Sequence, residues 1–349
     1  MAGLAEPPVP QDGHAHTKIL VRLQNHDDSF KALIAFRSTT SSSTTSCTTL
    51  TTVTTSKTST TSSPSPVPTP PKTPTGMRFA GINIAGFDFG CGTDGTCIVS
   101  DVTPASNYAG QMNHFYNDDN LNIFRLPVGW QYLVNNQAGG NLDSGNMATY
   151  DRQVQACLST GAHCIIDIHN YARWNGKIIG QGGPSNAQFA SLWSQLASKY
   201  ASQTKVIFGI MNEPHDIPDI KAWAQTVQTV VTAIRGAGAT SQMILLPGND
   251  WTSAAAFVPN GSLQALKSVV NPDGSTANLI FDVHQYLDSD SSGTSTECVR
   301  NNINNAFAPL ASSLRAINRQ ALLSETGGGN TASCKQYLCQ QLEYLKYVF

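Results

Sequence analysis

Charged side chains are scarce in this sequence of 349 residues, where Asp, Glu, Lys and Arg together make up 13%. An ordinary soluble domain has about 25%. Neither sign of charge dominates, because the formal net charge is −2. A nucleic-acid partner would require a clustered basic surface, and no run approaches the roughly 18 apolar residues that cross a bilayer. We therefore expect no nucleic acid and no membrane as a partner.

The missing charge is concentrated in one segment. Between Ser38 and Ser63, 22 of 26 residues are Ser or Thr, and 6 of the 12 residues in Pro64–Thr75 are Pro. Such a segment cannot bury enough apolar surface to offset the entropy lost on ordering. We predict a disordered Ser/Thr/Pro-rich linker over residues 38–75, either an O-glycosylated stalk or a generic linker without glycans.

This linker divides the chain into an N-terminal extension, residues 1–37, and a globular part, residues 76–349. The sequence does not indicate a role for the extension, and Met1–His16 lacks the apolar core of a signal peptide. In the globular part, short apolar runs predict buried strands at Phe79–Ile84, Asn122–Val128, His163–His169, Lys205–Asn212, Gln242–Pro247, Leu279–Tyr286 and Gln320–Ser324. Helical periodicity between or after them predicts helices at Ala187–Tyr200, Asp219–Arg235, Val299–Asn318 and Cys334–Tyr347.

This alternation predicts a parallel α/β architecture, either an open doubly wound sheet or a closed barrel. Polar and aromatic residues recur after six consecutive strands, whereas an open sheet gathers its site at one switch point. The pattern favours a (β/α)₈ barrel, the TIM-barrel fold. Because only seven strands are present, we expect a barrel truncated before the eighth strand, with an open edge.

Two glutamates carry the sharpest chemical signal. Glu213, in Ile210–Pro214, and Glu325, in Leu322–Gly329, each end an apolar strand. A carboxylate is costly to bury there unless a site requires it. At equivalent strand ends both would face the same barrel mouth, and a pair about 5–5.5 Å apart is the geometry of a retaining glycosidase. The alternative is that each is a solvated glutamate in a loop.

Residues at other strand ends could support such a pair. Arg125 lies on an apolar strand and needs a carboxylate partner. It could keep a nucleophilic glutamate ionised, or it could form a structural salt bridge without a catalytic role. His169, Asn170, His284 and Tyr286 could position the nucleophile and polarise hydroxyls, although a single histidine at a strand end is more often a core residue.

Three of the five tryptophans follow strand ends directly. Trp130, Trp174 and Trp251 would offer flat faces that suit the C–H faces of sugars, although each alone is more typical of a core. Three at one rim make a sugar-binding cleft plausible.

Three segments resemble cofactor- or metal-binding motifs, but none of them completes its motif. The Gly90–Gly95 segment fits a dinucleotide pattern but does not lead into a helix. Asp288–Gly293 begins like a calcium loop, yet position 12 is Val299 rather than a bidentate glutamate. His163 and His169 lack the further ligands of a zinc site. We expect no cofactor and no metal.

The eight cysteines are spaced as disulfides rather than as metal ligands. Cys91 and Cys97 bracket a glycine-rich loop, Cys157 precedes Cys164 by seven residues, and Cys298 and Cys334 flank the last two strand–helix units. Cys339 has no obvious partner in the globular part, and Cys47 is an unpromising one. Disulfides and the sequon at Asn260 agree with an extracellular location.

Six segments in order resemble the motifs of fungal endoglucanases of glycoside hydrolase family 5: Gly81–Cys91, Phe124–Trp130, Ile166–Tyr171, Gly209–Asp216, Phe281–Asp288 and Leu323–Asn330. The resemblance extends from about Phe79 to Phe349. It implies a secreted enzyme, expected to be a monomer, that cleaves internal β-1,4-glucosidic bonds of cellulose with retention. The family's acid/base falls on Glu213, preceded by Asn212, and its nucleophile falls on Glu325. Its supporting residues fall on Arg125, His169, His284 and Tyr286.

The resemblance also implies an eighth strand that carries a substrate-stacking tryptophan and the partner of Cys339, and the sequence stops before both. Within the same mechanism, a mannanase or a xyloglucanase is the alternative. A barrel fragment without activity is an alternative of a different class. A lectin-like binder is a third, which the two strand-end glutamates disfavour.

Overall fold

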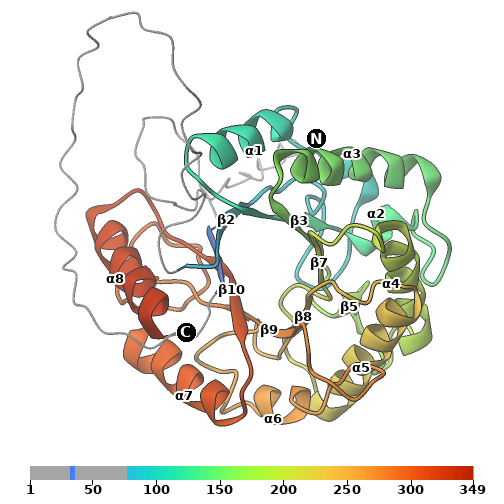
Figure 1. The fold of residues 1–349 in the computed structure, drawn as a ribbon. Helices are drawn as coiled ribbons and strands as arrows, with labels where there is room; N and C mark the ends of the chain where they lie inside the picture. Colours follow the sequence, from blue (N-terminus) through green and yellow to red (C-terminus); the bar gives the residue numbers. More distant parts are fainter. Residues whose placement is uncertain (1–31, 36–76, 349) are drawn as a thin grey trace, which may run out of the picture.

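A computed structural model describes residues 32–35 and 77–348, and within these ranges eight strands close into a barrel (Figure 1). Seven of them run parallel in chain order around the barrel, and all seven were predicted from the sequence. They are β2 (Phe79–Asn83), β3 (Ile123–Val128), β4 (His163–Ile168), β7 (Val206–Gly209), β8 (Ile244–Pro247), β9 (Leu279–His284) and β10 (Ala321–Thr326). A two-stranded hairpin, β5 (Arg173–Trp174) and β6 (Lys177–Ile178), lies outside the barrel sheet.

The eighth position is filled by β1 (Ala32–Ala35), which pairs antiparallel with both β10 and β2. Ala35 lies opposite Phe79 on one side, and Ile34 lies opposite Leu323 on the other. The sequence predicted an open edge at this position. The structure corrects this, because a short extended segment satisfies the backbone groups that β2 and β10 would otherwise leave unpaired. The predicted linker, residues 38–75, lies outside the described residues.

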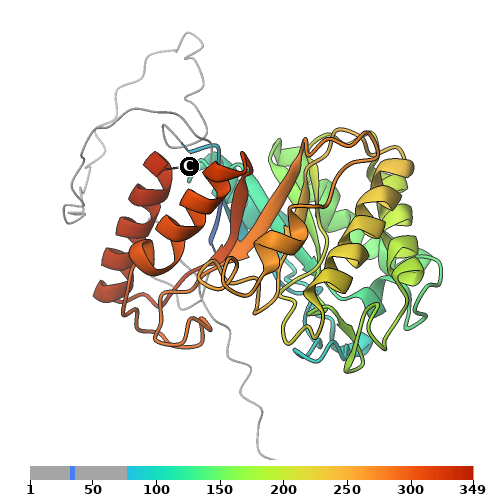
Figure 2. The ribbon, with the colours of Figure 1, turned by 90° about the horizontal axis from the view of Figure 1, so that it is seen from below.

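Helices form a ring around the barrel, and Figure 2 shows them on both sides of the strands. In chain order they are α1 (Tyr108–Asn117), α2 (Trp130–Leu133), α3 (Ser144–Thr160), α4 (Asn186–Tyr200), α5 (Ile220–Gly236), α6 (Ser262–Leu266), α7 (Ala308–Ala316) and α8 (Ala332–Val348). No helix in these ranges is both long and apolar enough to span a membrane.

Side-chain caps explain where several helices begin. Asp143 accepts hydrogen bonds from the backbone at the start of α3, and Asp219 does so for α5. Ser185 and Gln188 form a capping box at α4, which satisfies amides that have no partner within the helix. The helix predicted over Val299–Asn318 instead begins with a π-turn, η2 (Ile303–Phe307). Asn302 precedes that turn in a left-handed conformation and donates to the carbonyl of Tyr286.

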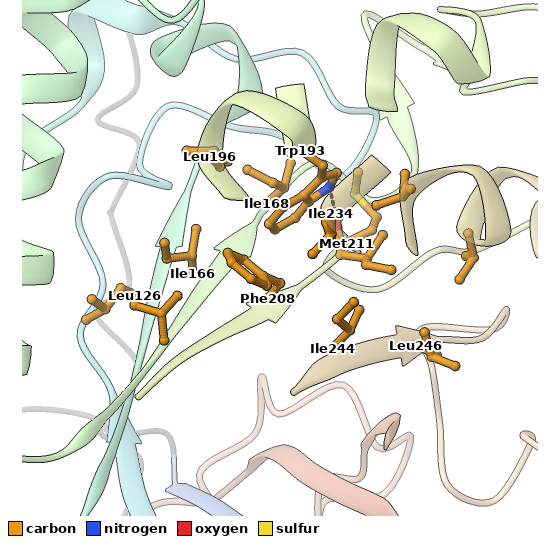
Figure 3. Packing of buried hydrophobic residues seen from close by; sticks show 14 of the residues in the cluster. Leu126, Ile166, Ile168, Trp193, Leu196, Phe208, Met211, Ile234, Ile244 and Leu246 are labelled. Atoms are coloured by element: carbon orange, nitrogen blue, oxygen red, sulfur yellow. Dashed lines mark hydrogen bonds between the residues drawn. The ribbon is translucent and has the colours of Figure 1, made fainter. Parts of the chain in front are cut away.

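The main hydrophobic core lies between the barrel and the helices. Figure 3 shows side chains of β3, β4, β7 and β8, among them Leu126, Ile166 and Phe208, packed against Trp193 and Leu196 of α4. The indole Nε1 of Trp193 donates to the carbonyl of Ile210 at 3.2 Å. This bond ties α4 to the backbone three residues before Glu213.

A second core cluster consists of one side chain from each of six strands: Phe79, Ile123, Ile165, Ile207, Leu245 and Leu322. Side chains at i and i+2 of a strand face the same way. Ile280 of β9 is partly buried and packs against this cluster. Two residues further along, the same faces of β3, β4, β9 and β10 carry Arg125, Asp167, Asp282 and Ser324, and all four are buried. The barrel interior therefore changes from an apolar layer to a charged layer as it approaches the carboxyl ends of the strands.

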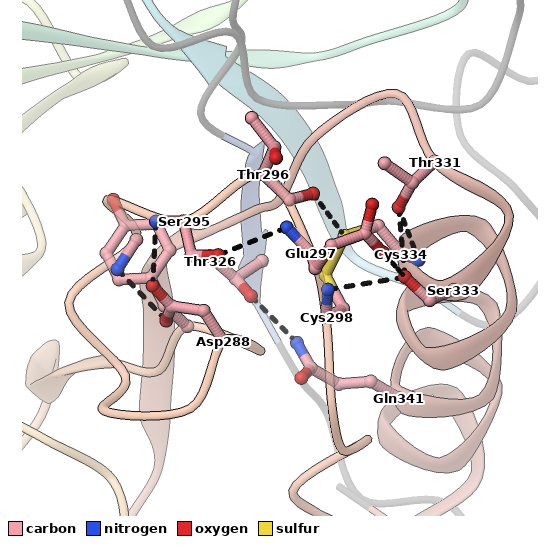
Figure 4. The surroundings of a disulfide bond; sticks show 12 residues. Asp288, Ser295, Thr296, Glu297, Cys298, Thr326, Thr331, Ser333, Cys334 and Gln341 are labelled. Carbon is pink, nitrogen blue, oxygen red and sulfur yellow. Dashed lines mark hydrogen bonds between the residues drawn. A yellow bond between two sulfur atoms is a disulfide. The ribbon is translucent and has the colours of Figure 1, made fainter.

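Three disulfides confirm the predicted pairs: Cys91–Cys97, Cys157–Cys164 and Cys298–Cys334. The last joins the loop after β9 to α8 (Figure 4). Cys339, expected to lack a partner, is also disulfide-bonded. That expectation was wrong, and Cys47 lies outside the described residues.

Candidate active site

Arg125 lies at the centre of the charged layer, with 1% of its side chain exposed. Its Nη1 donates to Glu325 Oε1 at 2.5 Å and to Asn83 Oδ1 at 3.0 Å. Its Nη2 lies 2.9 Å from Asp167 Oδ2 and 2.7 Å from Asn212 Oδ1. Burial alone would lower the pKa of Arg125, but Asp167, Glu325 and the other nearby carboxylates outweigh burial and raise it. The guanidinium is therefore a fixed positive charge.

Glu325 lies at the end of β10 and is as buried as Arg125. A register irregularity between Leu323 and Glu325 sets this carboxylate opposite His284 of β9, as a bulge re-aims a side chain. Its Oε1 accepts from Arg125, and its Oε2 accepts from the Tyr286 hydroxyl. Burial, together with Glu325 and Glu213, raises the pKa of Tyr286 well above its usual value. The phenol stays protonated, so both oxygens of Glu325 are held by donors, which suits an ionised nucleophile.

Glu213 follows β7 in a loop and is less enclosed, with 16% of its side chain exposed. Its backbone has φ of 40°, in the left-handed region that costs a non-glycine residue about 1–3 kcal/mol. Neighbouring contacts hold this turn, since the backbone N–H of Trp251 donates to the Pro214 carbonyl at 3.0 Å. The Trp251 indole also stacks on His215, with ring centroids 3.9 Å apart.

The two glutamates lie together with His284. One oxygen of each glutamate and one ring nitrogen of His284 are all within 4.8 Å of one another, and His284 Nδ1 is 2.7 Å from Glu213 Oε1. Carboxyl groups about 5–5.5 Å apart suit a retaining double displacement. The same three groups include carboxylate and imidazole ligands of the kind that divalent metals take, although Glu325 Oε1 already accepts a hydrogen bond from Arg125.

The other predicted supporting residues also surround this pair. Asn212 gives its oxygen to Arg125, while its Nδ2 is buried without a hydrogen-bond partner among the described residues. His169 Nδ1 lies 2.8 Å from Asp167 Oδ2, and its Nε2 lies 3.4 Å from the Tyr171 hydroxyl. The structure therefore brings Glu213, Glu325, Arg125, His169, Asn212, His284 and Tyr286 into one cluster.

The predicted substrate-binding residues divide into two groups, two that are fully buried and two that are at least partly exposed. Trp130 is fully buried against Trp174 and Phe189, so it is a core residue. Asn170 is also fully buried. Its Oδ1 accepts from the backbone N–H of Trp130, and its Nδ2 donates to Gln131 Oε1, so it joins the loop after β4 to α2. Both follow a strand end, but neither side chain is exposed to solvent. Trp251 is 39% exposed, and Trp174 is partly buried.

Asp167, Asp282 and Ser324 also belong to the cluster, although the sequence did not predict them as site residues. Asp167 accepts from both Arg125 and His169, and Ser324 lies between Asp282 and His284. A signal was present, because each aspartate interrupts an apolar strand, as in Ile165–Ile168 and Phe281–Val283. Burying a carboxylate in that setting requires a charged or hydrogen-bonding partner.

Comparison with known proteins identifies the family. The Cellulase (glycosyl hydrolase family 5) model matches residues 83–347. Endoglucanase EG-II of Hypocrea jecorina is 69% identical over 283 residues, which cover 78% of this chain and 68% of that protein. Manganese dependent endoglucanase Eg5A of Phanerodontia chrysosporium is 49% identical over 287 residues, which cover 81% and 72%.

A crystal structure of Cel5A (EG2) from Hypocrea jecorina superposes with a TM-score of 0.76 at 68% identity, covering 77% of this chain and 84% of that one. XacCel5A in complex with cellopentaose gives a TM-score of 0.67 at 30% identity, covering 76% and 84%. Sequence, fold and clustered glutamates all lead to the same assignment: the chain belongs to glycoside hydrolase family 5, the cellulase family.

Proposed function

We propose that this chain hydrolyses internal β-1,4-glucosidic bonds of β-glucans with retention, with Glu325 as nucleophile and Glu213 as acid/base. The observation that carries the proposal is the contrast between two glutamates whose oxygens lie within 4.8 Å. Glu325 is buried between the donors Arg125 and Tyr286. Glu213 is partly exposed and contacts an imidazole that can exchange protons with it.

In the first step, Glu325 attacks the anomeric carbon while Glu213 gives its proton to the departing glycosidic oxygen. The carbon–oxygen bond breaks, and a covalent glycosyl-enzyme forms on Glu325. Arg125 and Tyr286 hold the nucleophile in one orientation, so little reorganisation is needed before attack.

In the second step, Glu213 is ionised and takes a proton from water, which attacks the anomeric carbon and releases Glu325. Two inversions give net retention. Glu213 ends the cycle protonated, as it began.

The substrate is a neutral, hydroxyl-rich polymer, and two features support this choice. The exposed face of Trp251 can pack against a sugar ring. Asn212 Nδ2, buried without a partner among the described residues, can donate to a sugar hydroxyl, since buried donors rarely stay unpaired. Relatives named as endoglucanases support a β-1,4-glucan. The disulfides support secretion, because oxidising compartments preserve such bonds.

Three variants test the roles on carboxymethylcellulose. Glu325→Gln should lose activity on every substrate. Glu213→Gln should lose activity on the polymer but keep much of its first step on an aryl cellobioside whose leaving group needs no proton. Glu297→Gln, at an exposed glutamate that contacts Ser333, is the matched control and should behave as the parent. Retained polymer hydrolysis by Glu325→Gln would refute the nucleophile assignment.

Substrate class and stereochemistry require two further measurements. Soluble β-1,4-glucan, mannan and xyloglucan should be compared side by side, and the glucan should be cleaved fastest. NMR of the first-formed product should show the β-anomer. Faster turnover of mannan or xyloglucan would transfer the proposal to that substrate, and an α-anomer would exclude the double displacement.

A further inference from the structure

Behind Glu213, three buried side chains continue away from the mouth as one hydrogen-bonded chain. His284 faces Glu213 Oε1 with Nδ1 at 2.7 Å and faces Ser324 Oγ with Nε2 at 2.9 Å. Ser324 Oγ in turn donates to Asp282 Oδ1 through a short bond. Asp282, His284 and Ser324 are all buried, so bulk water does not compete for these contacts.

The inventory of donors assigns the protons along this chain. A serine hydroxyl has one proton, and the Asp282 carboxylate receives it. Ser324 Oγ can then only accept from His284, so the imidazole carries its proton on Nε2. Nδ1 is left facing Glu213, and a single proton lies between the two.

Charged groups face His284 from several elements. They are Glu213 in the loop after β7, Asp282 on its own strand and Glu325 on β10, with Arg125 of β3 and Asp167 of β4 further inside. Burial lowers the pKa of His284, but the three carboxylates outweigh burial and raise it. Burial also raises the pKa of Asp282, against the opposing effects of His284 and Arg125.

Resting on the proposed function, we propose that Asp282 and Ser324 are positioning residues that fix the proton of His284 on Nε2. The His284–Glu213 pair then holds the one proton that passes to the leaving group. Proton balance is simple: that proton departs with the first product, and the proton of the attacking water replaces it. Asp282 and Ser324 keep their own protonation states throughout.

Three variants change this chain in different ways. Ser324→Ala removes the acceptor at Nε2, so neutral His284 can carry its proton on Nδ1 and stabilise ionised Glu213. Asp282→Asn replaces an acceptor by an amide that can donate to Ser324, which reverses the direction of the chain. Ser324→Thr keeps the hydroxyl and should restore parent behaviour. Thr326→Val is the matched control, because that hydroxyl, also buried on β10, donates to the Gln285 carbonyl and accepts from Gln341. Figure 4 shows the contact with Gln341.

The first readout is the pH profile of kcat/KM, whose alkaline limb reports the essential acid. We expect Ser324→Ala and Asp282→Asn to move this limb down by about one pH unit, while the acid limb stays in place. Rates should fall most for aryl cellobiosides with poor leaving groups, which need the proton most. Ser324→Thr and Thr326→Val should show neither change.

The second readout does not depend on activity. The ¹⁵N shifts of His284 should show a protonated Nε2 in the parent, and a proton moved to Nδ1 in Ser324→Ala and Asp282→Asn. Uniform rate losses for all leaving groups, with an unchanged alkaline limb and tautomer, would overturn the proposal and leave these residues a purely structural role. If Glu213→Gln shows no dependence on the leaving group, the proposed function itself fails, so the two failures are distinguishable.

Discussion

Replacing Arg125 by methionine tests the charged layer most directly. Arg125 holds four acceptors, among them Glu325 and Asp167. Methionine keeps an unbranched flexible stem and has no donor, so two buried carboxylates would lose their cation. Removing one partner of a buried ion pair costs about 3–5 kcal/mol. At roughly 2–4 °C per kcal/mol in a domain of this size, the melting temperature should fall by about 6–20 °C.

Activity should fall further than stability accounts for. Loss of one preorganised donor at a reacting charge lowers kcat by about 10²–10³, and Arg125 also orients Asn212. The cation favours ionised Glu325, so without it the nucleophile ionises at a higher pH. The acid limb of the pH profile should therefore move up, whereas the Ser324 variants move the alkaline limb.

The assay is polymer hydrolysis across pH, measured well below each variant's melting temperature. Arg235→Met is a matched control, because this buried arginine bonds only the neutral acceptors Asn271 and Ala239 among the contacts described. It should lose stability but keep the kcat and pH limits of the parent. An Arg125→Met variant with the parent's kcat and acid limb would refute the reasoning.

Three further predictions concern other parts of the molecule. Trp251→Ala should raise KM on soluble glucan about tenfold, at roughly 1–1.5 kcal/mol for a lost ring face, and Trp251→Tyr should recover most of it; unchanged KM in both would remove Trp251 from the binding surface. Burial, Lys205 and Arg78 lower the pKa of His163 from 6.5 to about 4. Between these pH values the unfolded chain binds more protons than the folded one, so this contribution to stability is present above pH 6.5 and is lost toward pH 4. In urea titrations, His163→Gln should reduce that loss of unfolding free energy by about 1–2 kcal/mol, allowing for solvent screening. Parallel plots of stability against pH for the parent and the variant would contradict this. Leu33→Pro, which removes a backbone donor from β1 opposite Gly81, should lower stability by about 1–3 kcal/mol in thermal unfolding, whereas an unchanged transition would exclude a role of β1 in closing the barrel.

Local pattern was enough to predict the seven parallel strands and to place both glutamates at strand ends that share one barrel mouth. Each strand is a short apolar run, and each glutamate stands where such a run stops, so neighbours in sequence carry the information. β1 could not be found this way. Its four residues resemble any short apolar segment, and only the backbone groups of β2 and β10, far along the chain, give it a place.

The direction of a side chain was the second feature that the sequence could not predict. Trp130 and Trp251 both follow a strand end, yet one is fully buried and the other is 39% exposed. Trp130 begins the short helix α2 and packs against Phe189 of α4, whereas Trp251 lies in a loop where it stacks on His215. The position of each residue in the chain predicts that it follows a strand end. It does not predict the direction in which the ring points, because that depends on neighbours from other loops.

The buried aspartates were not predicted as site residues because their role depends on several strands coming together. Asp167 and Asp282 each look like an isolated defect in an apolar strand, but the barrel gathers them with Glu213 and Glu325 around Arg125 and His284. Four carboxylates then face one permanent cation. Such an excess of negative charge in a buried layer favours retaining a proton, and the contacts show where it can be kept, between His284 and Glu213. The same excess that makes Arg125 indispensable to Glu325 thus leaves Glu213 supplied with the proton that an acid catalyst needs.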